Sequence, residues 1–131
     1  MIFLDTNIIS YFFNANTMVK EKLLEAIDND ENICTTVINI YEILKGFRWK
    51  NNEKKEEQLN EFLDDVIIFT IDEEVVNIAA NIYSRLRKNG KTIGDADILI
   101  ASIVIKNNGI LVSNNTKHFE DIEELKLINW I

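Results

Sequence analysis

The stretch MIFLDTNIIS (residues 1–10) decides how the rest of the chain can be arranged. Four apolar residues run directly into Asp5, and a polar Thr-Asn pair follows. A buried strand gains nothing from a carboxylate, because removing its charge from water is costly unless a partner compensates. Asp5 therefore either caps a helix that starts at Asn7 or holds a charged ligand at the end of a strand.

The length and cysteine content predict one soluble domain that spans residues 1–131. A chain of this length buries enough surface to fold without a disulfide or a structural metal. The single Cys34 excludes a disulfide framework and a zinc cluster. No basic-then-apolar leader precedes Asp5, and no apolar run approaches the ~18 residues of a membrane span. We therefore expect a cytoplasmic protein that makes no membrane contact.

The charge balance gives a mixed indication about nucleic acid. The net charge is −8, from 14 Lys+Arg against 22 Asp+Glu, whereas phosphate binding normally shows as a basic footprint. Bound divalent cations would cancel part of this charge. Two basic stretches, KGFRWK (45–50) and RLRKNGK (85–91), could also act locally, although each is more simply a solvated helix end.

Apolar runs alternate with helical patterns along the whole chain. Five short runs are typical of buried strands: IFL (2–4), NICT (32–35), VIIFTI (66–71), ILVS (110–113) and LKLINWI (125–131). Strands that alternate with helices predict an α/β sandwich with a parallel sheet. Because the runs are apolar throughout, we expect the strands to be covered on both faces.

Four helices are predicted between the strands. The first begins at Thr36 and stops at Gly46, and the second covers residues 53–65. The third is indicated by the helical spacing of Val75, Ala79, Ile82 and Leu86 before Asn89-Gly90, and the fourth covers residues 96–109. The last of these is almost wholly apolar, so both of its sides should be covered. We expect Gly109 to be its C-cap.

Polar residues gather where ligands bind in open parallel sheets, beyond the carboxyl ends of the strands. Asp5 follows the first strand, and residues 113–115 (Ser-Asn-Asn) follow the fourth. Asp95 and Asp97 begin the apolar helix, and Glu42 lies at the edge of a buried helix face. This set offers oxygen donors without nitrogen or sulfur, which suits Mg²⁺ or Mn²⁺ better than Zn²⁺.

Each acid also has a structural explanation. Asp5 and Asp95 could be helix N-caps, and Asp97 could be a first-turn acid favoured by the helix dipole. Glu42 could be a helix-surface residue in an ion pair. His118, the only histidine, is expected to be structural or at the surface, because no acid–base pattern surrounds it.

Four segments, in order along essentially the whole chain, match the pattern of a known family. They are the opening strand that ends in Asp5-Thr6-Asn7, Glu42 shortly before Gly46, IGDADILIAS (93–102) with the third acid at Asp97, and LVSNNTKHF (111–119). On these residues the chain resembles the PIN-domain family, and within it the VapC-type toxins of toxin–antitoxin pairs. Many members carry an acid where this chain has Asn115, which brings no charge and disfavours tight binding of a second metal.

The resemblance implies a three-layer α/β sandwich around a central parallel five-stranded sheet of order 3-2-1-4-5. That order places Asp5 and Asn115 beside the crevice at the topological switch point. The resemblance also implies a Mg²⁺-dependent endoribonuclease, with Mn²⁺ as an alternative ion. Asp5, Glu42 and Asp97 would be its catalytic metal ligands, and Thr6 and Asn7 would orient Asp5.

The partners implied by the resemblance are an RNA substrate, a cognate antitoxin that occludes the groove, and a second copy of the chain in a homodimer. An apolar docking surface is predicted at Phe12, Phe13, Phe47 and Trp49, although ordinary packing explains these aromatics equally well. Two alternatives remain open. The first is a PIN nuclease of RNA processing without a toxin role, and the second is a nuclease-dead PIN-like binding module.

The two acids that begin the apolar helix should not share one role. Residues two apart on a helix point about 200° away from each other. We predict that Asp97 faces Asp5 and Glu42, and that Asp95 is chiefly an N-cap with at most an outer contact to a metal. Without an ion, close like charges should raise the pKa of at least one of the three facing acids. Replacing Asp5 by Asn should leave the fold intact or slightly stabilised.

Overall fold

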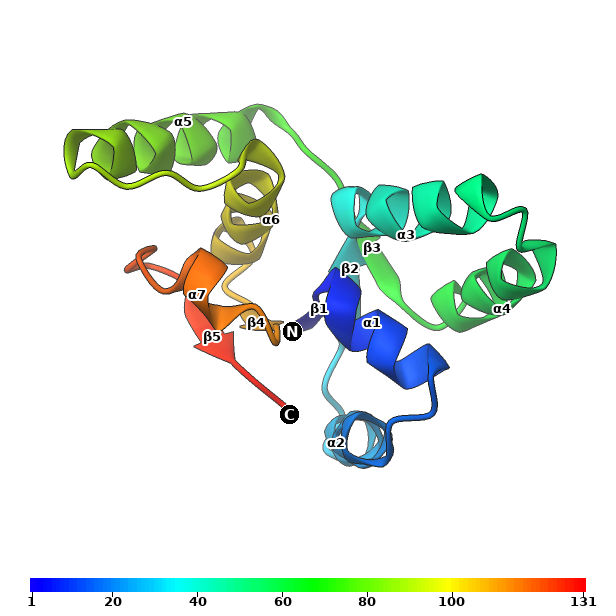
Figure 1. The fold of residues 1–131 in the computed structure, drawn as a ribbon. Coiled ribbons are helices and arrows are strands. Elements are labelled where there is room, and N and C mark those ends of the chain that lie inside the picture. Colours follow the sequence, from blue (N-terminus) through cyan, green and yellow to red (C-terminus); the bar gives the residue numbers. More distant parts are fainter.

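The computed structural model describes residues 1–131 and contains one five-stranded sheet. Its strands are β1 (Ile2–Leu4), β2 (Ile33–Thr36), β3 (Ile67–Phe69), β4 (Ile110–Val112) and β5 (Lys126–Ile128). All neighbouring strands pair in parallel, in the order β3-β2-β1-β4-β5 (Figure 1). The predicted fold class and strand order are confirmed.

Seven helices connect the strands. They are α1 (Thr6–Phe13), α2 (Thr17–Asp28), α3 (Val37–Trp49), α4 (Glu53–Leu63), α5 (Glu73–Lys88), α6 (Asp95–Lys106) and the short α7 (Thr116–Phe119). Helices α2 and α7 were not predicted, and a helix in the place of α1 was only one of the two alternatives considered for Asp5. In α2 the signal was present, because its buried Val19, Leu23 and Ala26 have helical spacing. None of the helices combines the length and the apolar character needed to span a membrane.

Each face of the sheet carries its own core, as three layers require. Successive side chains of a strand point to opposite faces. In β1, Phe3 therefore joins the core made with α5, α6 and α7, whereas Ile2 and Leu4 join the core made with α1 to α4. Most of α6 between Ile98 and Val104 is buried, which confirms that both sides of this helix are covered.

The edge strand β3 is less covered than its apolar sequence predicts. Ile67 and Ile68 are each 44% exposed, and β3 is an edge strand with a neighbour on one side only. The central strands β1 and β2 are buried at every position. The prediction that both faces of the strands are covered is thus correct for the middle of the sheet and wrong for this edge.

The glycine predicted to stop α3 does not stop it. The helix continues through Gly46 to Trp49, and its C-cap is Lys50. An added Cβ at Gly46 would meet nothing within 4 Å, so the residue marks neither a turn nor a close approach. A glycine inside a helix is tolerated at a cost of roughly 1 kcal/mol relative to alanine.

The glycine predicted to cap α6 has a different function. The helix ends at Lys106, its C-cap is Asn107, and Asn108 adopts the left-handed conformation with φ 52°. Gly109 instead lies against β1, where an added Cβ would be 2.5 Å from Cε2 of Phe3. Only a residue without a side chain fits beside this ring.

Most of the predicted aromatic docking surface is part of the packing. Phe12, Phe13 and Phe47 are half-buried. Phe12 and Phe13 pack on Phe62 with ring centroids 5.1 and 5.8 Å away, and Phe13 lies 6.4 Å from Phe47. Trp49 alone is well exposed, at 86%. The packing interpretation is therefore correct for three of the four aromatics.

Candidate active site

Asp5 occupies the N-cap position of α1, but its carboxylate does not cap the helix. Oδ1 accepts a hydrogen bond from Nδ2 of Asn39 at 2.9 Å, and Oδ2 accepts one from Oγ of Ser113 at 2.6 Å. The residue is only 5% exposed. The fold thus fixes a buried carboxylate at the carboxyl ends of β1 and β4, where the sequence placed a ligand-binding acid.

Asn39 organises this part of the site, although the sequence analysis did not select it. Its buried side chain donates to Asp5 and, at 3.0 Å, to Oγ1 of Thr6, and its Oδ1 accepts from Oγ1 of Thr36 at 2.7 Å. Thr36 is the N-cap of α3 and accepts from the backbone N–H of Asn39. A polar residue three positions after a capping threonine, within an apolar helix, was the available signal.

Glu42 lies one turn further along α3 and is held by Thr6. Oγ1 of Thr6 donates to Oε1 of Glu42 at 2.9 Å while it accepts from Asn39. Thr6 was predicted to orient Asp5; it orients Glu42 instead, and Asn39 and Ser113 hold Asp5. One chain of hydrogen bonds therefore connects two of the three acids.

The third acid comes from the start of α6. The N-cap of this helix is Gly94, and its first residue is Asp95, so the prediction that Asp95 is the N-cap is wrong. Asp95 is exposed, whereas Asp97 is half-buried. Oδ2 of Asp97 lies 3.1 Å from Nδ1 of His118 in α7. His118 is at the surface, as predicted, and it also contacts this acid.

The electrostatics connect Asp97 with the other two acids. Its pKa is raised above the ordinary value, chiefly by burial, and the carboxylates of Asp5 and Glu42 add to the rise, while His118 opposes it. A raised pKa was predicted from like-charge repulsion. The direction is confirmed for Asp97, and burial rather than repulsion is the largest cause.

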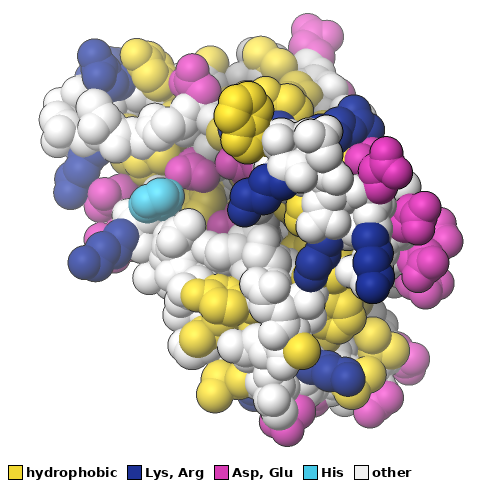
Figure 2. All heavy atoms as spheres, turned by 45° about the vertical axis from the view of Figure 1, so that its right-hand side comes forward, with side chains coloured by type: hydrophobic (Ala, Val, Ile, Leu, Met, Phe, Trp, Pro, Cys, Tyr) yellow, Lys and Arg dark blue, Asp and Glu magenta, His cyan; other side chains and the backbone are white.

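The acids line one cavity of about 440 Å³. Its walls are formed by Asp5, Thr6, Asn7, Ser10, Tyr11, Asn14, Glu42, Asp97, Asn115 and His118, and Asp95 is not among them. On the face shown in Figure 2, both acidic and basic side chains lie near the histidine, and more Lys and Arg side chains gather farther across the same face. We call this space the carboxylate cavity. It lies at the switch point between β1 and β4, where the strand order reverses.

The family model of the PIN domain matches residues 2–125. The chain belongs to the PIN-domain family. Ribonuclease VapC1 of Methanocaldococcus jannaschii is 32% identical over 126 residues, which cover 96% of this chain and 84% of that protein. Ribonuclease VapC2 of Rickettsia felis is also 32% identical, over 128 residues that cover 97% of this chain and 96% of the relative.

Solved structures share the whole PIN domain. VapBC2 from Rickettsia felis bound to a DNA fragment from its promoter contains a chain that matches with a TM-score of 0.90 at 32% identity, covering 100% of both chains. VapBC-1 from nontypeable Haemophilus influenzae contains a chain with a TM-score of 0.87 at 26% identity, covering 99% of this chain and 98% of that one. Both are similar over essentially their full lengths.

The donors of this PIN domain fit a hard cation that keeps part of its water shell. No three acidic, histidine or cysteine side chains come close enough together to ligate one ion directly. Mg²⁺ usually retains several waters and is held by one or two carboxylates. Three carboxylates spaced around one polar cavity, with no sulfur donor on its walls, therefore suit Mg²⁺ and would not form a closed zinc site.

Two amides complete the cavity wall beside these acids. Oδ1 of Asn7 accepts from the backbone N–H of Asn114 at 3.2 Å, while its buried Nδ2 has no hydrogen-bond partner. Asn115 is exposed, and its backbone N–H donates to Oγ of Ser113. Buried amide groups are nearly always paired in folded proteins. The Nδ2 of Asn7 is an exception to this rule, and it is closed off from solvent although other atoms of Asn7 line the cavity.

Proposed function

We propose that this PIN domain is a Mg²⁺-dependent endoribonuclease and the toxin of a VapBC-like toxin–antitoxin pair. The observation that carries the proposal is the convergence of Asp5, Glu42 and Asp97 on one cavity from three separate elements. The relatives named above are ribonucleases, and the similar structures are VapBC assemblies. A chain of this kind acts on RNA and has an antitoxin partner.

In this proposal Asp5, Glu42 and Asp97 hold the ion directly or through its bound waters. Mg²⁺ held there would supply the Lewis acidity that activates a water as nucleophile and the positive charge that offsets the charge of the phosphate. Residues of the chain itself orient the acids that hold the ion. Ser113 and Asn39 fix Asp5 before any ligand arrives, and such preorganised support is what metal ligands generally require.

Two further residues have roles that follow from their contacts. Thr6 holds Glu42 in one orientation through its hydroxyl donor. Asn7 holds the segment after β4 against α1, because its Oδ1 accepts a hydrogen bond from the backbone N–H of Asn114. Without an ion, the clustered carboxylates repel RNA, so a chelator should abolish cleavage.

Cleavage assays on a matched pair of variants test the catalytic part. Purified protein should cleave RNA with Mg²⁺ present and lose that activity in EDTA. Asp97→Asn should reduce cleavage more than about a hundredfold, beyond the range for outer-sphere partners of a metal. Asp95→Asn, two residues away and outside the cavity, should keep most activity. Equal activity of the two variants would contradict the assignment of Asp97.

Co-expression with the product of a short upstream reading frame tests the toxin part. That product should co-purify with the chain and inhibit cleavage. Mg²⁺-dependent cleavage without any such inhibitor would favour a PIN nuclease of RNA processing, and no cleavage at all would favour a binding module. Sedimentation of the purified chain tests the homodimer that we also propose.

A further inference from the structure

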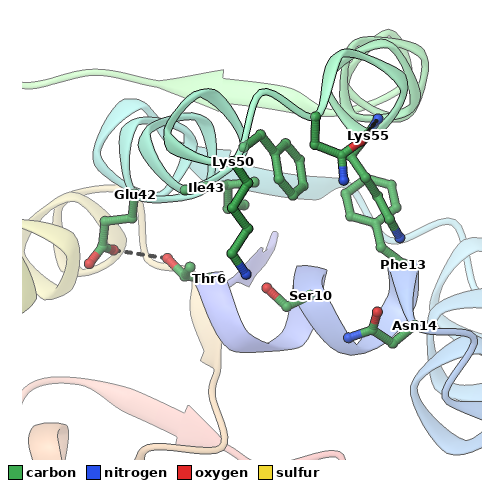
Figure 3. Close-up of a pocket in the computed structure, with 11 residues that line it drawn as sticks. Thr6, Ser10, Phe13, Asn14, Glu42, Ile43, Lys50 and Lys55 are labelled. Atoms are coloured by element: carbon green, nitrogen blue, oxygen red, sulfur yellow. Dashed lines mark hydrogen bonds between the residues drawn. The ribbon is translucent and has the colours of Figure 1, made fainter.

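A second hollow adjoins the carboxylate cavity, between α1, α3 and the start of α4 (Figure 3). Its volume is about 340 Å³. Thr6, Ser10, Asn14 and Glu42 line both spaces. A ligand with an extended chain can therefore pass from one space into the other along α1. We call the second space the lysine hollow.

The charge changes sign between the two spaces. Glu42 lies at their junction, and beyond it the charged side chains of the lysine hollow are Lys50 and Lys55. In Figure 3 the side chain of Lys50 extends from α3 across the hollow toward Ser10. Neither lysine forms a salt bridge. Two unpaired cations face this hollow in a chain whose net charge is −8.

The rest of the lysine hollow is part apolar and part polar. Phe13, Ile43 and Phe47 contribute its apolar surface, and Asn14 and Asn52 contribute amide groups. Grooves for single-stranded nucleic acid combine cations that follow the backbone with apolar or aromatic surface next to the bases. An acidic peptide would use the lysines, but it would also meet Glu42 and the other carboxylates at the far end.

We propose that the lysine hollow is a second RNA subsite, in which Lys50 and Lys55 hold a backbone phosphate of the strand that reaches the carboxylate cavity. This inference rests on the proposed ribonuclease function. The acids repel a polyanion until an ion is present, so attraction for the strand has to come from cations nearby. The lysines are positioning residues, and they set the direction in which the strand crosses α1.

Steady-state kinetics provide the first test. The double variant Lys50→Ala/Lys55→Ala should raise KM for a single-stranded RNA by about tenfold, with kcat nearly unchanged, since lost phosphate contacts weaken binding rather than chemistry. Lys54→Ala is the matched control, because Lys54 is exposed on the same helix as Lys55 and lines neither space. Thermal unfolding of all variants shows that the fold is retained.

Salt dependence provides a second test that needs no cleavage. An Asp97→Asn background is mixed with a fluorescein-labelled RNA of about 16 nucleotides, the upper end of site sizes for such grooves. Each lysine that contacts a phosphate contributes about 0.7 to the slope of log K against log salt for a single strand. Removing Lys50 and Lys55 should therefore reduce the slope by about 1.4, and Lys54→Ala should not change it.

The two tests separate this inference from the proposed function. If the unmodified protein does not cleave RNA with Mg²⁺, the ribonuclease proposal fails, and a reduced salt slope still supports an RNA subsite. If the protein cleaves RNA while the double variant keeps its KM and its slope, the subsite is overturned and the ribonuclease stands. Loss of antitoxin affinity with unchanged RNA kinetics also overturns it, in favour of a protein occupant.

Discussion

The two walls of the carboxylate cavity are built in different ways. What we call the strand wall consists of Asp5, which lines the cavity, and of Asn39 and Ser113, which hold it from behind. Its residues are at most 5% exposed and are joined by hydrogen bonds. The helix wall (Asp97 and His118) has side chains that are 25% and 57% exposed, joined by one contact. Folding alone therefore fixes the strand wall, whereas the helix wall has freedom to adjust when a ligand binds.

The largest effect is expected from removing the charge at the centre of the strand wall. Asp5→Asn should lower cleavage more than about a hundredfold, beyond the range for outer-sphere partners of a metal. It should also destabilise the fold by about 1–2 kcal/mol, because an amide has one acceptor oxygen for the two donors of Asn39 and Ser113. Urea unfolding and an RNA cleavage assay measure the two effects.

This result would differ from the expectation based on the sequence, which was an intact or slightly more stable fold. That expectation assumed an uncompensated charge, and the structure provides two donors that compensate it. Full cleavage by Asp5→Asn with Mg²⁺ present would contradict the metal site. Unchanged stability would show that Ser113 reorients to donate elsewhere.

The next largest effect is expected at Asn39, which has no direct place in the proposed chemistry. Asn39→Ala should destabilise the protein by about 2 kcal/mol, because it removes the donor to Oδ1 of Asp5 and the acceptor of the Thr36 hydroxyl proton. Cleavage should fall about 10- to 100-fold, as for other groups that orient metal ligands. The control is Asn81→Ala, at an exposed helix position. Equal effects of the two changes would show that the strand wall is not organised by Asn39.

The sequence predicted the strand wall only in part, because the residues that hold Asp5 are far from it along the chain. It correctly placed Asp5 at a strand end beside the segment that contains Ser113. It could not determine which groups hold the carboxylate, because its two donors lie 34 and 108 residues away along the chain. Local patterns detect a capping position, and Asp5 does occupy one. They do not show that the side chain is used elsewhere.

The glycines illustrate the same limit in the fold. Gly109 has the sequence context of a helix cap, yet its small size is needed because the ring of Phe3 packs against it from β1. The strand order was implied by the family resemblance and agrees with the structure. What periodicity could show is the existence of most helices and strands. Their ends depend on packing partners that are distant in sequence.

The charge of Asp97 should make the stability of the folded protein depend on pH. Its raised pKa means that the folded protein binds this proton more tightly than the unfolded chain does. The stabilising contribution is complete below the ordinary pKa of about 3.9 and is lost as pH rises through the raised value. In EDTA at neutral pH, Asp97→Asn should therefore be slightly more stable than the unmodified protein, by up to about 0.5 kcal/mol.

Unfolding measured between low and neutral pH tests this sign. The advantage of Asp97→Asn should vanish at low pH, where both side chains are neutral. Adding Mg²⁺ at neutral pH should reverse the order, because an ion that binds the folded carboxylate stabilises the unmodified protein by mass action. A destabilising Asp97→Asn change in EDTA would show that the helix wall is as firmly built as the strand wall.

The smallest effect is expected from His118, the exposed half of the helix wall. His118 lowers the pKa of Asp97 through its charge and its hydrogen bond. His118→Ala should therefore raise that pKa further and move the acid limb of the pH–rate profile of cleavage to higher pH. Stability should change by no more than about 0.5 kcal/mol, because the contact is partly solvated. Lys117→Ala, its exposed neighbour in α7, controls for the loss of a positive charge at this surface and should leave the profile in place. A large loss of cleavage at every pH in His118→Ala would instead give the histidine a direct part in the reaction, and the helix wall would then be more than an adjustable partner of the strand wall.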